Sequence, residues 1–125
     1  MLLDSTVFID FIRGYKPAVE VFEQLFHGQS TSVLTKLELI VGIKSKKDIK
    51  SIETLLRALR ITVLPITEEV SNTAETILVK FYHSHRIGML DSFIAATALV
   101  YDEELITSNK KHFDFIPDLK LLTLY

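Results

Sequence analysis

The chain of 125 residues has no cysteine, and its 4 glycines and 3 prolines are scattered singly. The lack of cysteine excludes disulfides and thiolate metal sites, and nothing indicates an oxidising compartment. No apolar run approaches the roughly 18 residues that a membrane-spanning helix needs, and the start does not resemble a signal peptide. Internal repeats and Gly/Ser linkers are also missing. We therefore expect a cytoplasmic protein with no membrane span, folded as a single domain over residues 1–125.

The sequence also lacks an excess of charge of either sign, because it has 14 Lys and Arg and 16 Asp and Glu, for a net charge of −2. A nucleic-acid-binding protein more often has a basic face. This balance does not point to nucleic acid, but acids gathered in one pocket can coexist with basic surface elsewhere. The densest basic run, over 44–50, is most simply a solvated helix end. Apolar residues make up 48% of the chain, enough for one hydrophobic core.

Short apolar runs alternate with longer amphipathic ones, which predicts an α/β fold with a parallel sheet covered on both faces. The expected strands are 1–3, 30–34, 61–64, 104–107 and 119–122. The expected helices are 7–13, 17–26, 36–44, 49–59, 67–84 and 90–101, with Thr67 as a cap. Phe11, Phe22 and Phe26 on the early helices suit either the core or an interface.

Polar residues far apart in the sequence are predicted at the carboxyl edge of this sheet, where sites form in such folds. Asp4 ends the first strand, and Glu38 is placed in the first turn of the helix after the second strand. Asp91 opens the helix before the fourth strand, and Asn109 follows that strand. Spacing does not give the strand order. If the first and fourth strands are neighbours, Asp4, Asp91 and Asn109 meet.

Clustered carboxylates repel one another, by about 4 kcal/mol for a unit pair ~4 Å apart at an effective dielectric of ~20. Protonation of one acid relieves this repulsion, and so does a hard cation among them. Ligands that are all oxygen favour Mg²⁺ or Mn²⁺. Such an ion can activate a water for attack on a phosphodiester.

Each of these residues also has a purely structural explanation. Thr35 and Glu38 fit a capping box with Thr35 as the N-cap. Asp91 fits compensation of a helix dipole, and Asn109 fits a turn. Asp4 is harder to explain in this way, because a carboxylate at the end of a short buried strand needs a partner.

Four segments, in order, resemble the motifs of the PIN domain family. They are Leu-Leu-Asp-Ser-Thr-Val-Phe-Ile-Asp at 2–10, Thr-Lys-Leu-Glu-Leu-Ile-Val-Gly at 35–42, Gly-Met-Leu-Asp-Ser-Phe-Ile-Ala-Ala-Thr-Ala at 88–98 and Thr-Ser-Asn-Lys-Lys-His-Phe at 107–113. The closing Ile-Pro-Asp-Leu at 116–119 resembles the tail of VapC-type toxins. The resemblance covers essentially the whole chain.

This resemblance implies a three-layer α/β/α sandwich with a mainly parallel sheet of about five strands, and a Mg²⁺- or Mn²⁺-dependent endoribonuclease. VapC-like members are toxins of prokaryotic toxin–antitoxin pairs. They usually form homodimers and are neutralised by a small antitoxin that fills the active-site groove. Matched motif by motif, the metal-binding and catalytic acids are Asp4, Glu38 and Asp91, and Asn109 completes the catalytic set.

The fourth motif departs from the family pattern. Asn109 takes the asparagine position, but His112 stands where an acid often appears, and Asp114 lies beyond it. With one negative charge fewer, a second cation would bind more weakly. We therefore predict one well-held metal, with Asn109 orienting a water or the substrate.

Hydroxyl and basic side chains flank these acids. Ser5 and Thr6 either cap the first helix or orient Asp4 and its water. The predicted substrate-positioning residues are Ser5, Thr6, Thr107, Lys110 and Lys111. Further basic candidates for RNA phosphates are Arg13, Lys36 and Arg86.

Other functions fit the sequence less well. A phosphoacceptor receiver domain needs an aspartate at the end of its third strand, and residues 61–65 contain none. An Asp-x-Asp phosphatase needs an acid at position 6, where Thr6 stands. The serious alternative is a non-catalytic PIN-like binding module. The retention of all three carboxylates argues against it.

Overall fold

The computed structural model describes residues 1–25 and 27–123, and its elements follow the predicted alternation. The strands are β1 (Leu2–Leu3), β2 (Ser30–Ser32), β3 (Thr62–Leu64), β4 (Leu105–Ile106) and β5 (Leu121–Leu122). The α-helices are α1 (Ser5–Ile12), α2 (Lys16–Leu25), α3 (Val33–Val41), α4 (Lys46–Ala58), α5 (Glu68–His85) and α6 (Met89–Val100). A 3₁₀ turn that was not predicted, η1 (Lys110–His112), follows β4.

The strands form one parallel sheet in the order β3-β2-β1-β4-β5. The chain runs outward from β1 through β2 to β3, and then returns to place β4 on the other side of β1. The first and fourth strands are therefore neighbours, with Leu3 opposite Ile106. Their shared carboxyl edge is the switch point of the topology, where ligands bind in open parallel sheets.

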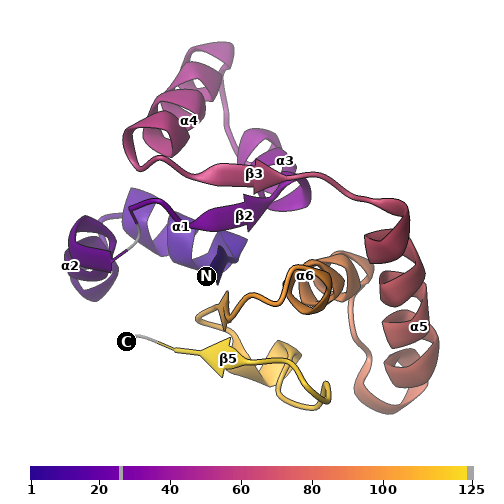
Figure 1. Ribbon diagram of the computed structural model, residues 1–125. Coiled ribbons are helices and arrows are strands. Elements are labelled where there is room, and N and C mark those ends of the chain that lie inside the picture. Colours follow the sequence, from indigo (N-terminus) through magenta and orange to yellow (C-terminus); the bar gives the residue numbers. More distant parts are fainter. Residues whose placement is uncertain (26, 124–125) are drawn as a thin grey trace.

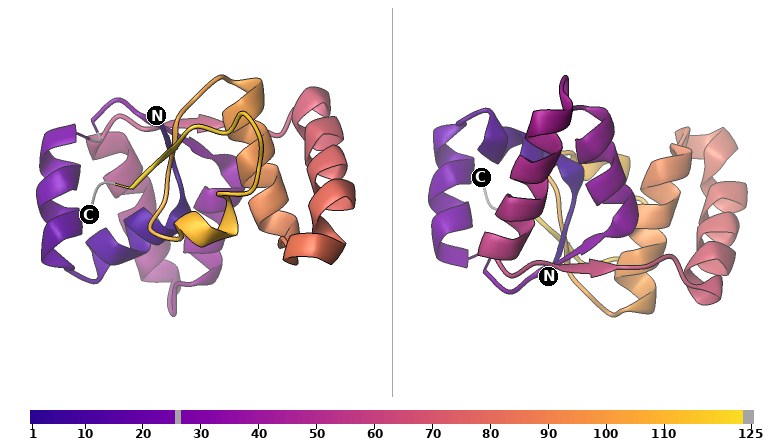
Figure 2. Two further views of the ribbon diagram at one scale, coloured as in Figure 1. Left: turned by 90° about the horizontal axis from the view of Figure 1, so that it is seen from below. Right: turned by 90° about the horizontal axis from the view of Figure 1, so that it is seen from above.

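Helices cover both faces of the sheet, which confirms the three-layer α/β/α prediction (Figures 1 and 2). Leu3 and Ile106 pack into a core formed with α1 to α4, whereas Leu2 and Leu105 pack into a second core with α5 and α6. All four side chains are fully buried. Each contributes about 1.5–3 kcal/mol through burial, so two-residue strands suffice to anchor the centre of the sheet.

The start of α3 differs from the prediction. Ser32 is the N-cap, since its hydroxyl accepts the Leu34 N–H at 3.1 Å. The capping box with Thr35 as N-cap is therefore wrong, and Glu38 lies in the second turn of α3 rather than the first. The physical reason is that β2 ends at Ser32, two residues before the predicted end, and Ser is a preferred N-cap residue.

Two of the three early phenylalanines belong to the interior. Phe22 is buried and packs against Phe8 and Phe11 with tilted rings, whose centroids lie 5.4 Å and 4.6 Å from that of Phe22. Phe11 is partly buried against the same core, and Phe26 lies outside the described residues. None of the helices in the described part of the chain is long and apolar enough to cross a membrane.

Candidate active site

Asp4 lies between the end of β1 and the start of α1, at the switch point of the sheet. Its backbone N–H donates to Ile106 O at 3.0 Å, which ties it to the end of β4. The side chain is only 4% exposed. It makes no capping hydrogen bond to α1, so its carboxylate is available for other partners.

Two threonine hydroxyls hold this carboxylate. Thr6 and Thr107 both donate to Asp4 Oδ2, at 3.1 Å and 2.9 Å. The same hydroxyls accept backbone N–H groups, Thr6 from Ser108 and Thr107 from Asn109, each at 3.0 Å. Among the described residues no hydrogen bond reaches the other oxygen, Oδ1. The pair of hydroxyls fixes the orientation of Asp4 and leaves one oxygen for a ligand. This favours an orienting role for Thr6 over capping.

Glu38 reaches the site from α3 and is half-buried. Ser5 donates its hydroxyl to Glu38 Oε2 at 3.3 Å, which links the start of α1 to α3. Burial raises the pKa of Glu38 first, and the charges of Asp4 and Asp91 raise it further, against the lowering effect of the Ser5 hydrogen bond. The three carboxylates therefore influence one another, although they come from three separate segments.

Asp91 occupies the third position of α6, and its neighbour is His112 of η1. His112 Nδ1 lies 3.1 Å from Asp91 Oδ2. Burial is the largest cause that raises the pKa of Asp91; Asp4 raises it as well, while His112 lowers it. His112, which stands in the fourth motif where relatives often have an acid, therefore lies directly beside Asp91 of the third motif.

The donor set fits a hard divalent cation. Its members are carboxylate oxygens, and their mutual repulsion is the kind that a cation relieves. No group of three or more His, Cys, Asp or Glu among the described residues encloses a cation directly. Mg²⁺, however, keeps several waters and uses only one or two carboxylates. The Thr35 hydroxyl, one helical turn before Glu38, is buried without a hydrogen-bond partner in the described chain, and an ordered water could satisfy it.

Some of the other predicted site residues lie beside these acids, and others have partners elsewhere. Asn109, Lys110 and Lys111 are exposed, and Asn109 is tied to Thr107 through its backbone N–H, which donates to the Thr107 hydroxyl. Lys36 instead pairs with Glu53 at 2.7 Å. Arg86 lies at the end of α5, with its guanidinium over the ring of Tyr82 at 5.5 Å.

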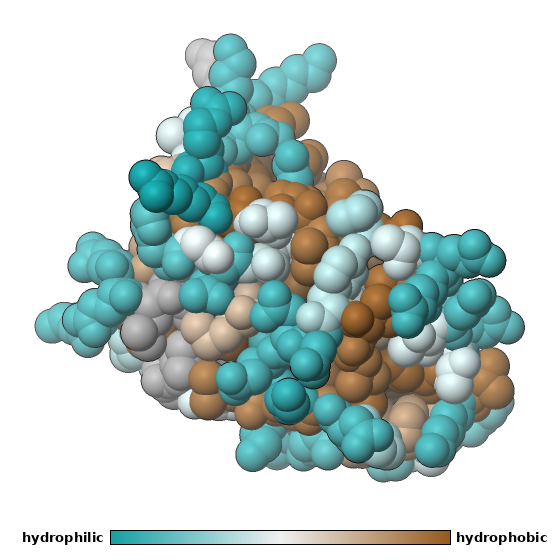
Figure 3. All heavy atoms as spheres, in the orientation of Figure 1, coloured by the Kyte–Doolittle hydropathy of each residue, from teal (hydrophilic) through white to brown (hydrophobic). Residues whose placement is uncertain are grey.

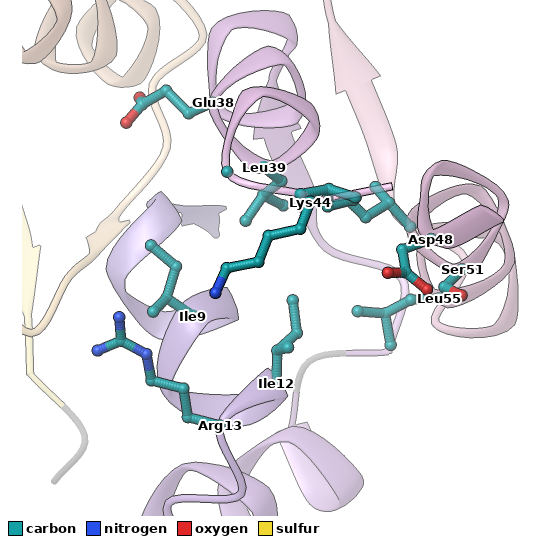
Figure 4. Close-up of a pocket in the computed structure, with 12 residues that line it drawn as sticks. Ile9, Ile12, Arg13, Glu38, Leu39, Lys44, Asp48, Ser51 and Leu55 are labelled. Atoms are coloured by element: carbon teal, nitrogen blue, oxygen red, sulfur yellow. The ribbon is translucent and has the colours of Figure 1, made fainter. Parts of the chain in front are cut away.

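A cavity of about 570 Å³ adjoins the acids, since Glu38 is one of its lining residues (Figure 4). Lys44 also lines it. Lys44, Lys46 and Lys50 are exposed, which agrees with the solvated helix end that the sequence indicated for this run. One feature of the sequence could have placed Lys44 there, since it comes three residues after the end of α3, the helix that carries Glu38.

The raised pKa values predict how stability depends on pH when no cation is bound. Between the ordinary pKa of each acid and its higher folded-state pKa, the folded protein binds more protons than the unfolded chain. Stability should therefore rise as the pH falls through the raised folded-state pKa values of Glu38 and Asp91, and this gain is complete below their ordinary pKa values of 4.5 and 3.8. We expect thermal unfolding in chelator to show this rise in wild type, a weaker rise in Glu38→Gln, and a reduced rise when Mg²⁺ is present. Identical pH profiles for wild type and Glu38→Gln would contradict the electrostatic coupling.

Comparison with known proteins gives consistent matches over nearly the whole chain. A sequence model described as PIN domain matches residues 1–118. Ribonuclease VapC19 of Mycobacterium tuberculosis is 31% identical over 123 residues, covering 95% of this chain and 96% of the relative. Ribonuclease VapC10 of the same species is 35% identical, covering 96% of this chain and 90% of the relative.

Solved structures also resemble the fold. VapBC-1 from nontypeable Haemophilus influenzae superposes with a TM-score of 0.81 at 29% identity, over 98% of this chain and 96% of that chain. A toxin–antitoxin complex from Klebsiella pneumoniae gives a TM-score of 0.75 at 26% identity, over 99% and 97% of the two chains.

Proposed function

The chain belongs to the PIN domain family, and from this premise we propose that it is a metal-dependent endoribonuclease. It hydrolyses RNA phosphodiester bonds and acts in the cytoplasm as the toxin of a prokaryotic toxin–antitoxin pair. The observation that carries this proposal is that Asp4 lies at the β1–β4 switch point and that the charges of Asp4 and Asp91 both act on Glu38. Relatives named as ribonucleases, which align over nearly their full length, support the reaction class.

Asp4, Glu38 and Asp91 would hold the cation, and Mg²⁺ or Mn²⁺ suits their oxygen ligands. When bound, such an ion supplies positive charge that stabilises the developing phosphorane and lowers the pKa of water. The protein holds the acids ready for it. Thr6 and Thr107 orient Asp4, and Ser5 orients Glu38 through its hydroxyl.

The residues after β4 complete the site in this proposal. His112 donates a ring N–H to Asp91 and so holds its carboxylate in place; the Nδ1 tautomer is assigned from the 3.1 Å contact. The exposed amide of Asn109 is available to a water or to the substrate. Lys110 and Lys111, also exposed, provide positive charge for RNA phosphates near these acids.

The proposed partners are an RNA substrate, a small antitoxin protein and a second copy of the chain. Support for the antitoxin comes from the similar structures, which are described as VapBC and toxin–antitoxin complexes. Support for a homodimer comes from large apolar side chains that are open to solvent, among them Val41, Val79 and Met89. Figure 3 shows apolar surface of this kind between hydrophilic side chains.

Purified protein without a partner tests the proposal. We expect it to cut at least one of tRNA, rRNA and mRNA when Mg²⁺ or Mn²⁺ is added, with products resolved on denaturing gels. Absence of cleavage across all three RNA classes with both metals would overturn the nuclease proposal. The chain would then be better described as a binding module of the same fold.

A further inference from the structure

The two carboxylate oxygens of Asp4 have different surroundings. Oδ2 accepts the hydroxyls of Thr6 and Thr107 at 3.1 Å and 2.9 Å, which occupies both of its lone pairs. Each hydroxyl also accepts a backbone N–H, from Ser108 or Asn109, so its single proton is left for Asp4. The two hydroxyls lie 3.3 Å from each other, a longer contact than either makes with the carboxylate. Within the described structure, Oδ1 is therefore the oxygen of Asp4 that is open to a cation.

Glu38 and Asp91 show the same division with one donor each. Glu38 Oε2 accepts the Ser5 hydroxyl at 3.3 Å, and Asp91 Oδ2 accepts the ring N–H of His112 at 3.1 Å. No donor in the described part of the chain reaches the second oxygen of either acid. Every acid of the site thus has one oxygen held by a side chain of a different element and one oxygen open.

A carboxylate held in this way can offer a cation one oxygen, directly or through a bound water. Mg²⁺ suits such ligands, because it is small, requires a nearly octahedral shell and keeps several of its waters. Mn²⁺ has the same preference for oxygen ligands. Ca²⁺ takes about 6–8 oxygens, a shell that protein sites commonly fill by using both oxygens of a carboxylate. Here the second oxygen becomes available only when its hydrogen bonds break.

We propose that Ser5, Thr6, Thr107 and His112 are positioning residues that set the metal specificity of the site, in favour of a small octahedral cation and against Ca²⁺. They keep one oxygen of each acid out of the coordination shell. Ligand number and flexibility are among the properties that separate Mg²⁺ sites from Ca²⁺ sites, and these four side chains restrict both. The inference rests on the proposed nuclease function, since it concerns the same cation, and it deepens that function by assigning what selects the metal.

The test compares the affinities of Mn²⁺ and Ca²⁺ by titration calorimetry, on protein first stripped of metal with chelator and dialysed. The double variant Thr6→Val/His112→Phe removes a donor from two of the acids while nearly keeping side-chain size. Each freed oxygen allows its acid to bind Ca²⁺ through both oxygens, whereas the loss of orientation weakens Mn²⁺ binding. We expect the ratio of the Ca²⁺ Kd to the Mn²⁺ Kd to fall by about tenfold, as for other substitutions just outside a metal's ligands.

The matched control is Thr6→Ser/His112→Asn, which changes the same two positions but keeps both donors. Serine retains the hydroxyl, and the amide nitrogen of asparagine takes the place of Nδ1. This variant should keep the Kd ratio of wild type. Ser5→Ala frees Glu38 by itself and should lower the ratio independently, so the test stands even where the double variant fails to fold. Thermal unfolding of each variant checks the fold.

Infrared difference spectra give a readout that does not depend on affinity. The antisymmetric and symmetric carboxylate stretches lie closer together when both oxygens bind one cation than when a single oxygen does. We expect the closer spacing in Thr6→Val/His112→Phe loaded with Ca²⁺, and the wider spacing in wild type loaded with Mn²⁺.

The failure of this inference is distinguishable from that of the proposed function. If wild type binds Mn²⁺ and cuts RNA, but the Kd ratio is unchanged in both Thr6→Val/His112→Phe and Ser5→Ala, metal selection by these donors is wrong while the nuclease function stands. An equal fall of the ratio in the donor-keeping control also overturns it, because the effect would then not depend on the hydrogen bonds. If wild type binds neither cation and cuts no RNA, both proposals fall together.

Discussion

Asp4→Asn is expected to reduce metal-dependent RNA cleavage by about 10³-fold or more. The substitution keeps the shape of the side chain but removes the charge of the most buried of the three acids. A catalytic cation contributes several kcal/mol to transition-state stabilisation, and each 1.36 kcal/mol is about tenfold in rate. The measurement is the initial rate of cleavage of a defined RNA at saturating Mg²⁺ or Mn²⁺.

Asp114→Asn is the matched control for this loss. Asp114 is an exposed acid just after η1, and its backbone N–H donates to Lys110 O at 3.0 Å. The same change of charge there should leave the rate within about twofold of wild type, as for a surface residue outside the site. Equal losses in the two variants would mean that Asp4 acts through net charge rather than as a ligand. Retained activity in Asp4→Asn would contradict the proposal that Asp4 holds the catalytic cation.

Removal of divalent cations is expected to abolish cleavage completely and reversibly. Chelator should stop the reaction, and either Mg²⁺ or Mn²⁺ should restore it. We further expect one tightly bound cation per chain, because the described site has three carboxylates and His112 stands beside Asp91 where relatives often have an acid. Anomalous scattering from crystals soaked in Mn²⁺ gives the number and occupancy of the sites.

Titration calorimetry with Mn²⁺ complements the crystal measurement. Wild type should bind one equivalent, and Asp91→Asn should weaken that binding without changing the fold, as judged by circular dichroism. His112→Asp is the informative partner variant, because it restores the acid of the family pattern. A gain of a second binding event in His112→Asp supports the charge argument. Two fully occupied sites in wild type would contradict it.

Local sequence patterns predicted most of the secondary structure. The helix capped by Thr67 runs over Glu68–His85, and the hydroxyl of Thr67 accepts the Val70 N–H at 3.2 Å. That interaction is contained within a few residues, so sequence alone can predict it. The start of α3 was missed because Ser32 and Thr35 are both acceptable caps, and the choice depends on where β2 stops pairing with its neighbours.

For the candidate site, too, local sequence predicted one part and not the other. Its acids could be named from sequence, since residue type and position relative to strands and helices are local properties. The partners of those acids could not. Thr107 binds Asp4 across 103 positions of sequence, and His112 meets Asp91 across 21. Such contacts follow from the return of β4 to the side of β1, which no periodicity encodes.

The sequence by itself therefore determined the alternation of strands and helices, the three carboxylates and their placement at strand ends or on helices near that edge. Tertiary structure decided that β1 and β4 are neighbours, which hydroxyls hold Asp4, and that His112 lies beside Asp91. The physical reason is that hydrophobic period and capping act over one or two helical turns. Strand order and side-chain convergence depend on how two separate cores pack against opposite faces of one sheet.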